Sequence, residues 1–138
     1  MKVEVRYHSR TGNTKKVALA IAEEAGVTAQ DLSAPLTEKA DVLFLGSAIY
    51  AAGIDGAVKR FIQENKDKIG VIYNFSTTAL LKSTYKRVKK AAAKNGVALA
   101  EAEFYCRGRF KGAHKDRPNE EDLNNARAFA REALKNNG

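Results

Sequence analysis

The sequence has one cysteine, two prolines, no tryptophan and no long hydrophobic run. The single cysteine, Cys106, cannot form an internal disulfide, and it leaves the redox compartment open. No apolar stretch approaches the roughly 20 residues that a membrane-spanning helix needs. The first residues already follow a strand pattern, which leaves no room for a signal peptide, so we expect a cytoplasmic protein.

Several sequence motifs are absent as well. The chain has neither the G-x-x-x-x-G-K-[ST] of a P-loop nor the G-x-G-x-x-G of a dinucleotide site. Its two histidines, one cysteine and carboxylates show no metal-ligand spacing, so we expect no metal. The absence of a cysteine near the first loop argues against a cysteine phosphatase that uses this loop as its phosphate cradle.

Composition indicates one globular domain over residues 1–138, since 44% of the residues are hydrophobic and 29% are charged. The formal net charge is +8, and it is unevenly distributed. Residues 82–117 hold eleven basic and three acidic residues, whereas the rest of the chain holds thirteen of each. The whole excess of positive charge therefore lies in one segment.

The stretch around which the chain is organised is KVEVRYHSRTGNTKKVALAI, residues 2–21. It begins with the alternation of a strand, continues through a short loop of hydroxyl, Gly and Asn residues, and ends with apolar residues at helical spacing. Such a strand–loop–helix directs backbone N–H groups and the positive end of a helix at one point. Gly12 permits a positive φ, and Asn13 can either cap the helix or donate its amide. The arrangement predicts an anion site, most simply for a phosphate.

The rest of the chain continues to alternate between strands and helices. Expected strands cover residues 27–32 (a weak edge strand), 42–46, 69–75 and 97–106. Asp55 can cap a second helix, which buries Val58, Phe61 and Ile62. A third helix buries Leu81, Tyr85, Val88 and Ala92, and it ends at Asn95–Gly96. The final helix starts at Asn119 with acidic residues in its first turn, and it buries Leu123, Ala126, Phe129, Ala130, Ala133 and Leu134.

This alternation predicts an α/β fold with three layers, in which a doubly wound parallel sheet of five strands has the order 2-1-3-4-5. Folds of this kind bind ligands beyond the carboxyl ends of their strands. The runs SRTGNT, SAIYAAG and STTA follow strands one, three and four, and we expect all three runs at that edge.

The S-x-T-G-N-T run after the first strand resembles the phosphate loop of flavodoxins, and the similarity covers essentially the whole chain. This resemblance implies FMN as cofactor. It assigns the phosphate to Ser9, Thr11, Gly12, Asn13 and Thr14, with Arg10 as an extra contact. It places the flavin ring between Ala48, Ile49, Tyr50, Ala51, Ala52 and Gly53 on one side and Ser76, Thr77, Thr78 and Ala79 on the other.

The same resemblance assigns roles to individual residues. Tyr50 would stack on the ring, with packing alone as the alternative. Gly53 would permit a peptide flip on reduction, and a tight turn explains this glycine equally well. The second loop lacks the aromatic side chain of many flavodoxins, which leaves the second ring face open. Cys106, Arg107 and Gly108 come near the ring, although the thiol is expected to be a buried small hydrophobe. Arg109 is a further candidate for contact with the ring or with a partner.

The basic segment departs from the family, because most flavodoxins are acidic. It implies redox partners with an acidic docking surface, steered by the field of the patch. A nucleic-acid surface is the less favoured interpretation, because the segment lacks interleaved aromatic residues, and a merely solvated basic face remains the simplest alternative.

The predicted function is therefore that of a small FMN-binding electron carrier, more an electron-transfer protein than an enzyme. One alternative is a flavodoxin-like FMN oxidoreductase that acts on a quinone or a porphyrinogen-type substrate. Another is a module of the same fold that binds a different anion or acts only through interaction.

Overall fold

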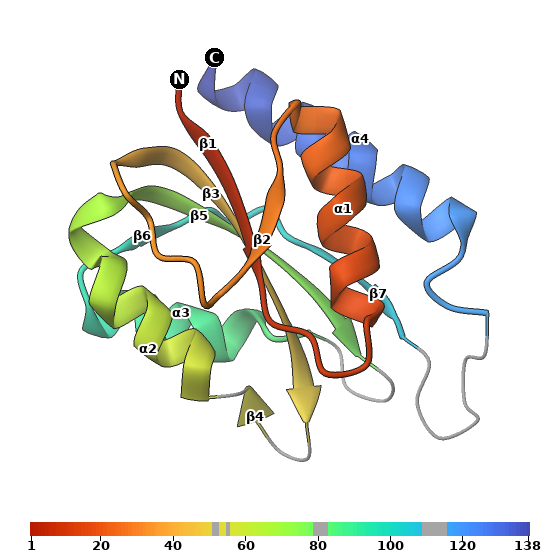
Figure 1. The fold of residues 1–138 in the computed structure, drawn as a ribbon, viewed down its shortest axis with the longest axis horizontal. Helices are drawn as coiled ribbons and strands as arrows, with labels where there is room; N and C mark the ends of the chain where they lie inside the picture. Colours follow the sequence, from red (N-terminus) through yellow and green to blue (C-terminus); the bar gives the residue numbers. More distant parts are fainter. Residues whose placement is uncertain (51–52, 55, 79–82, 109–115) are drawn as a thin grey trace.

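The computed structural model describes residues 1–50, 53–54, 56–78, 83–108 and 116–138, with the backbone alone at residues 49, 50, 53 and 54. A parallel sheet runs through the centre of the molecule (Figure 1). Its strands are β1 (Val3–Tyr7), β2 (Ala29–Asp31), β3 (Ala40–Tyr50), β5 (Ile69–Thr78), β6 (Ala98–Leu99) and β7 (Phe104–Arg107). The order is β2-β1-β3-β5, followed by β6 and β7, which both pair with β5. The predicted doubly wound order 2-1-3-4-5 is confirmed, with β6 and β7 sharing the fifth position.

Helices cover both faces of this sheet and complete the three predicted layers (Figure 1). One face carries α1 (Asn13–Ala25) and α4 (Glu120–Asn137), and the other carries α2 (Gly56–Asn65) and α3 (Tyr85–Lys94), with a short 3-10 turn η1 (Lys66–Lys68) after α2. Strand β3 contributes side chains to the hydrophobic cores on both faces of the sheet. Phe44 packs with the α1 and α4 side chains, whereas Leu45 packs with those of α2 and α3. A strand buried on both faces explains the continuous apolar run in its sequence.

The predicted helix ends are largely confirmed. Helix α1 ends at Gly26, which has a φ of 72° and donates its N–H to the last carbonyl groups of the helix. Asn119 caps α4 through a capping box: the Asp122 N–H donates to Asn119 Oδ1, while Asp122 Oδ2 accepts from the Asn119 N–H. The expected apolar face of α4 packs against the sheet, and Val88 and Ala92 of α3 are buried as predicted. Asp55 and Leu81 lie outside the described residues.

Three predicted boundaries are wrong. Strand β3 continues through Tyr50 and pairs with the two-residue strand β4 (Gly53–Ile54) in antiparallel fashion, so residues 48–50 are not a loop. Strand β5 continues through Thr78, so the first three residues of the predicted second loop are also strand. The strand predicted over residues 97–106 is broken, because two residues of β5 separate its paired positions Ile72 and Phe75, whereas four residues lie between Leu99 and Phe104. The two surplus residues leave the ladder, much as in a bulge.

The two ends of the chain lie on the same side of the molecule. Figure 1 shows the N and C termini close together, at the end of the sheet opposite to the points of the β3 and β5 arrows. Helix α4 runs antiparallel to the strands, which brings its last residue back to the side where β1 begins. The opposite side, where β1, β3, β5 and β7 end, is called the carboxyl edge below.

Candidate functional site

Strand register brings the predicted site segments together at the carboxyl edge. Tyr7, Gly46, Phe75 and Phe104 stand side by side on β1, β3, β5 and β7. The next residues of each strand therefore also lie alongside one another: Ala48 is paired with Thr77, and Thr77 with Cys106. The loop that follows β1 joins this row, because the His8 N–H donates to the carbonyl of Gly46 at 3.0 Å. The predicted convergence of the three polar runs at one edge is confirmed for the residues of these runs that the structure describes.

The loop of residues 9–14 forms a tight turn into α1. Gly12 has a φ of 90°, which an L side chain rarely adopts, and its N–H donates to Ser9 Oγ at 2.9 Å. Gly12 is itself the N-cap of α1 and Asn13 is the first helical residue, so of the two roles considered for Asn13 the capping role is wrong. Arg10 and Thr11 are exposed, whereas Ser9 is half-buried.

The space around Gly12 is open. A Cβ built on Gly12 would have no heavy atom within 4 Å, so the described structure leaves the space at this position open. The first backbone amides of α1 follow directly, and the amides of a first helical turn have no acceptor within the helix. The residues present therefore fit the phosphate group that the loop pattern implies.

A buried hydroxyl pair connects this loop to β5. Thr14 and Thr77 are 1% and 3% exposed, and their Oγ1 atoms lie 2.8 Å apart. The Thr14 side chain thus faces the sheet, and its backbone amide remains for contact with an anion.

The end of β7 closes the other side of the same loop. A Cβ on Gly108 would lie 2.8 Å from Asn13 Nδ2, so only glycine leaves room there for the Asn13 side chain in its present position. The Gly108 N–H donates to the carbonyl of Thr78, and an Arg107 Nη donates to Thr78 Oγ1. The residues predicted from three separate segments of the sequence are therefore in contact.

A second polar cluster lies on the other face of the sheet, and sequence reasoning missed it. The Thr84 hydroxyl accepts from Ser47 Oγ at 3.0 Å and from Asn74 Nδ2 at 3.1 Å, and the Thr84 N–H donates to Ser76 Oγ at 3.4 Å. All four side chains are at most 1% exposed. The available signal was Asn74, an amide within an otherwise apolar run that must find partners when it is buried. The cluster ties the start of α3 to the end of β5.

Cys106 packs in the core beneath α4 and is 6% exposed, as its interpretation as a small hydrophobe predicted. Burial, reinforced by the negative charge of Asp122 and opposed by Arg117, raises the pKa of the thiol to about 12. At neutral pH the side chain is a neutral thiol, which leaves it without the thiolate that nucleophilic chemistry needs.

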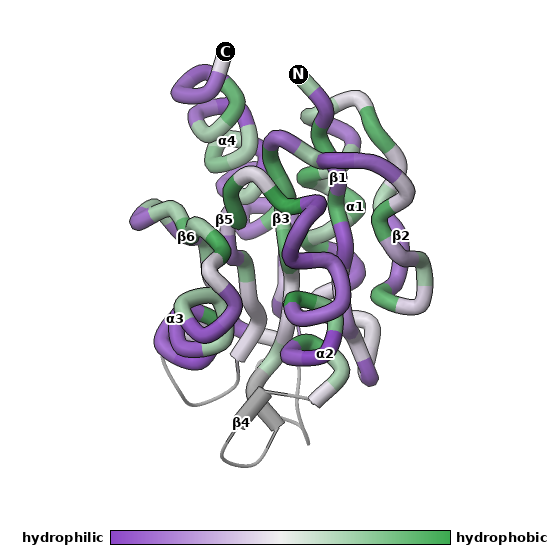
Figure 2. Tube along the Cα trace, turned by 90° about the vertical axis from the view of Figure 1, so that its left-hand side faces the viewer, coloured by the Kyte–Doolittle hydropathy of each residue, from purple (hydrophilic) through white to green (hydrophobic). Residues whose placement is uncertain are grey.

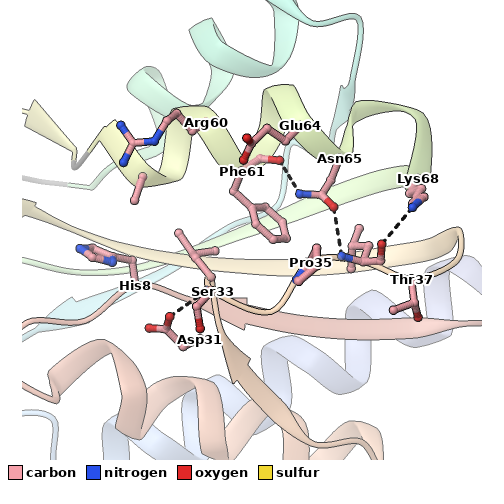
Figure 3. Close-up of a pocket in the computed structure, with 13 residues that line it drawn as sticks. His8, Asp31, Ser33, Pro35, Thr37, Arg60, Phe61, Glu64, Asn65 and Lys68 are labelled. Carbon is pink, nitrogen blue, oxygen red and sulfur yellow. Dashed lines mark hydrogen bonds between the residues drawn. The ribbon is translucent and has the colours of Figure 1, made fainter.

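A separate pocket opens on the α2 side of the sheet (Figure 3). It has a volume of about 880 Å³, and its walls are α2 and the segment that joins β2 to β3. Asn65 closes it by accepting from the Leu36 N–H and donating to the carbonyl of Phe61. His8, next to the loop of residues 9–14, and Asp31, the last residue of β2, line its end near the carboxyl edge, and no predicted site residue is among the described residues that line it.

Two further absences concern the part of the chain that the structure describes. Within it, no group of three or more His, Cys, Asp or Glu side chains could hold a metal ion. Among the same residues, no helix combines the length and apolar character needed to cross a bilayer.

Comparison with known proteins decides the family. A flavodoxin domain model matches residues 5–114, which is most of the chain. The chain belongs to the flavodoxin family. An uncharacterized protein of Methanocaldococcus jannaschii is 28% identical over 150 aligned residues, covering 99% of this chain and all of that protein.

Solved flavodoxins share the fold over their full length. A flavodoxin from the domain Archaea superposes with a TM-score of 0.81 at 15% identity, covering 99% of this chain and 98% of the other. A short-chain flavodoxin associated with a non-canonical PDU bacterial microcompartment gives a TM-score of 0.77 at 19% identity, with both chains fully covered. Flavodoxin 1 of Bacillus cereus gives 0.75 at 18% identity, with 98% of each chain covered.

Some of the predicted contact residues fall outside the described part of the chain. Ala51, Ala52, Ala79 and Arg109 lie outside the described residues, and the structure gives only the backbone of Ile49, Tyr50 and Gly53. The stacking of Tyr50 and the flip at Gly53 stay predictions.

Proposed function

We propose that this chain binds FMN non-covalently at the carboxyl edge and carries electrons between redox proteins. The observation that carries the proposal is the turn at Gly12, with its φ of 90° and the open space beside it, in a chain of the flavodoxin family. FMN would supply one-electron and two-electron redox chemistry, and the chain would hold the cofactor and present it to a partner.

The phosphate of FMN would rest against the turn formed by residues 9–14. The backbone amides at the start of α1 and the exposed side chains of Arg10 and Thr11 would be its donors. The ring would lie between the end of β3 with residues 51–53 and the end of β5, where Thr78 and Arg107 are hydrogen-bonded. Such a carrier needs no acid, base or nucleophile of its own.

The test is a titration of the purified protein with FMN and with riboflavin, which lacks the phosphate. We expect FMN to bind at least about 100-fold more tightly than riboflavin, since charge-assisted hydrogen bonds to the phosphate would be lost in riboflavin. The substitution Gly12→Ala should lower the FMN affinity about tenfold or more and leave the riboflavin affinity unchanged, because an alanine strains the phosphate turn.

Gly26→Ala is the matched control. Gly26 ends the helix that Gly12 begins, its φ is 72°, and a Cβ there would also have no heavy atom within 4 Å. Both substitutions impose similar backbone strain, but only Gly12→Ala should weaken FMN binding. Equal losses in the two variants would reject the phosphate contact at Gly12, and no binding at micromolar FMN would reject the cofactor.

Electron-transfer and turnover assays of the FMN-loaded protein then separate a carrier from an enzyme. Rapid exchange of electrons with redox proteins, without turnover of quinones or nicotinamide nucleotides, supports the carrier. Steady-state turnover of a quinone would instead support a flavin-dependent oxidoreductase.

A further inference from the structure

Helix α3 carries an unusual arrangement of charge. Its ten residues include five basic and no acidic side chains. All four of its lysines are exposed, whereas Val88, Ala91 and Ala92 are buried. Figure 2 shows α3 hydrophilic on its outer side and apolar toward the sheet. We call the exposed set Lys86, Lys89, Lys90 and Lys94 the lysine face.

The physics of an isolated helix opposes this arrangement. Lys86 lies in the first turn, where the helix dipole disfavours a cation, and the first turn of α3 contains no acid. Lys90 stands four residues from both Lys86 and Lys94, and like charges at this spacing destabilise a helix. Helix α4 shows the opposite, favourable pattern, with three acidic residues in its first turn.

The lysine face also has no counter-charge bonded to it among the described residues. On the opposite side of the sheet, Arg127 of α4 pairs with Glu23 at 3.1 Å, and Arg131 pairs with Glu24 at 3.2 Å. No lysine of the lysine face forms an ion pair with any residue that the structure describes. The positive charge of the lysine face is therefore available to a partner.

Helix α3 is held firmly against the proposed site. The N–H of its N-cap, Thr84, donates to Ser76 near the end of β5, and the Tyr85 hydroxyl donates to the carbonyl of Ala100 at 2.9 Å. The lysine face therefore begins at the carboxyl edge and extends away from it along α3. A protein bound there would stand beside the end of β5.

We propose that the lysine face is the docking surface for an acidic redox protein. This inference rests on the proposed function, and it specifies where the partner binds. Charge complementarity identifies the partner, because exposed lysines that repel one another and form no ion pair with a described residue gain most from a carboxylate-rich surface. A nucleic-acid surface is less well supported, since the one aromatic residue of α3, Tyr85, is half-buried with its hydroxyl bonded to Ala100.

The test measures binding of the flavin-free protein to three probes: an acidic plant-type ferredoxin, the basic cytochrome c and single-stranded oligothymidine. We expect the protein to bind ferredoxin and not cytochrome c. The affinity for ferredoxin should fall about tenfold between roughly 50 mM and 200 mM salt, because screening weakens exposed charge pairs.

The variant Lys89→Glu/Lys90→Glu should weaken ferredoxin binding about tenfold or more. The matched control is Lys39→Glu/Lys66→Glu, which changes the net charge equally through two exposed lysines just before β3 and β5, away from the carboxyl edge. The control should change the affinity less than about twofold. Far-ultraviolet circular dichroism of both variants verifies that each remains folded.

Three results would overturn the proposal. Equal losses in the two double variants would mean that ferredoxin senses only the total charge. Failure of the unmodified protein to bind ferredoxin would show that the lysine face is not a docking surface for an acidic redox protein. Tighter binding of oligothymidine, abolished by Lys89→Glu/Lys90→Glu, would make the lysine face a nucleic-acid surface. The FMN titration is independent of these measurements, so the cofactor and the docking surface succeed or fail separately.

Discussion

The hydroxyl of Thr14, in the first turn of α1, lies 2.8 Å from the hydroxyl of Thr77, near the end of β5. Neither side chain is more than 3% exposed, so this hydrogen bond forms away from water. It joins the proposed phosphate turn to the strand that would flank the flavin ring. The two halves of the proposed site are thus linked before any ligand binds.

Replacing one member of this pair should cost more than replacing both. Thr14→Val or Thr77→Val leaves a buried hydroxyl without its partner, and each should lower the free energy of unfolding by about 1–3 kcal/mol. The double variant should recover to within about 1 kcal/mol of the unmodified protein, because two apolar side chains of similar shape replace the pair. Urea unfolding of the unmodified protein, the two single variants and the double variant completes the double-mutant cycle. Additive losses of unfolding free energy would contradict the coupling between Thr14 and Thr77.

Gly108 should influence FMN through Asn13. Gly108→Ala places a methyl group against the Asn13 amide, so we expect the FMN affinity to fall about tenfold with a stability change below about 1 kcal/mol. The titration is repeated in an Asn13→Ala background, where the same methyl has no amide to displace and meets only the Cβ of residue 13 at 3.2 Å, so its further effect should be much smaller. A full additional loss in that background would show that Gly108 acts independently of Asn13.

The N-terminus of α4 should give stability a defined dependence on pH. Burial is the largest single influence on Asp122, and it raises the pKa of the carboxyl. Hydrogen bonds from Arg117 and from the Asn119 N–H, together with the positive charge of Arg117, lower the pKa by more than burial raises it. The net pKa of Asp122 is therefore below its ordinary value. A lowered carboxyl pKa stabilises the fold above the unfolded-state pKa of about 3.9, and this stabilisation is lost as the pH falls through the folded-state pKa.

Asp122→Asn should therefore lower the free energy of unfolding by about 1–3 kcal/mol near pH 7, and the deficit should shrink toward pH 3. Denaturant titrations at the two pH values measure it. The exposed neighbour serves as the control, since Glu121→Gln should change stability by less than about 1 kcal/mol. A deficit for Asp122→Asn that is equal at both pH values would contradict the assignment.

Cys106 should be inert in the folded protein. Its pKa of about 12 and its 6% exposure leave little accessible thiolate at pH 8, so iodoacetamide should label it only as fast as the protein unfolds. Mass spectrometry over a time course, with and without denaturant, measures the two rates. Labelling at equal rates in both conditions would place the thiol at the surface.

The sequence was sufficient to predict the fold because its strongest signals are local. The apolar run ending at Gly46, the glycine at position 26 and the Asn119 cap each act within a few residues. The phosphate turn was predicted for the same reason. The Thr14–Thr77 pair and the contact between Gly108 and Asn13 join residues distant in the sequence, so no local pattern could reveal them.

Strand ends were harder to predict, because pairing decides them. Residues 76–78 are hydroxylic and look like a loop, but β7 pairs with β5 as far as Thr78 and keeps them extended. The break between β6 and β7 depends on the count of residues in a neighbouring strand, which alternation within one segment does not contain. The buried cluster around Thr84 likewise depends on three strand residues that meet only in the folded sheet.

The position of the two termini has a practical consequence for building with this molecule. Both termini lie opposite to the carboxyl edge (Figure 1). A tag or surface tether at either terminus would therefore hold the protein with its proposed redox edge facing the solution. A redox domain fused directly to a terminus would begin on the side opposite to the proposed redox edge. Its linker would need to span the length of the sheet, at about 3.3 Å per strand residue, before electrons could pass between the two domains.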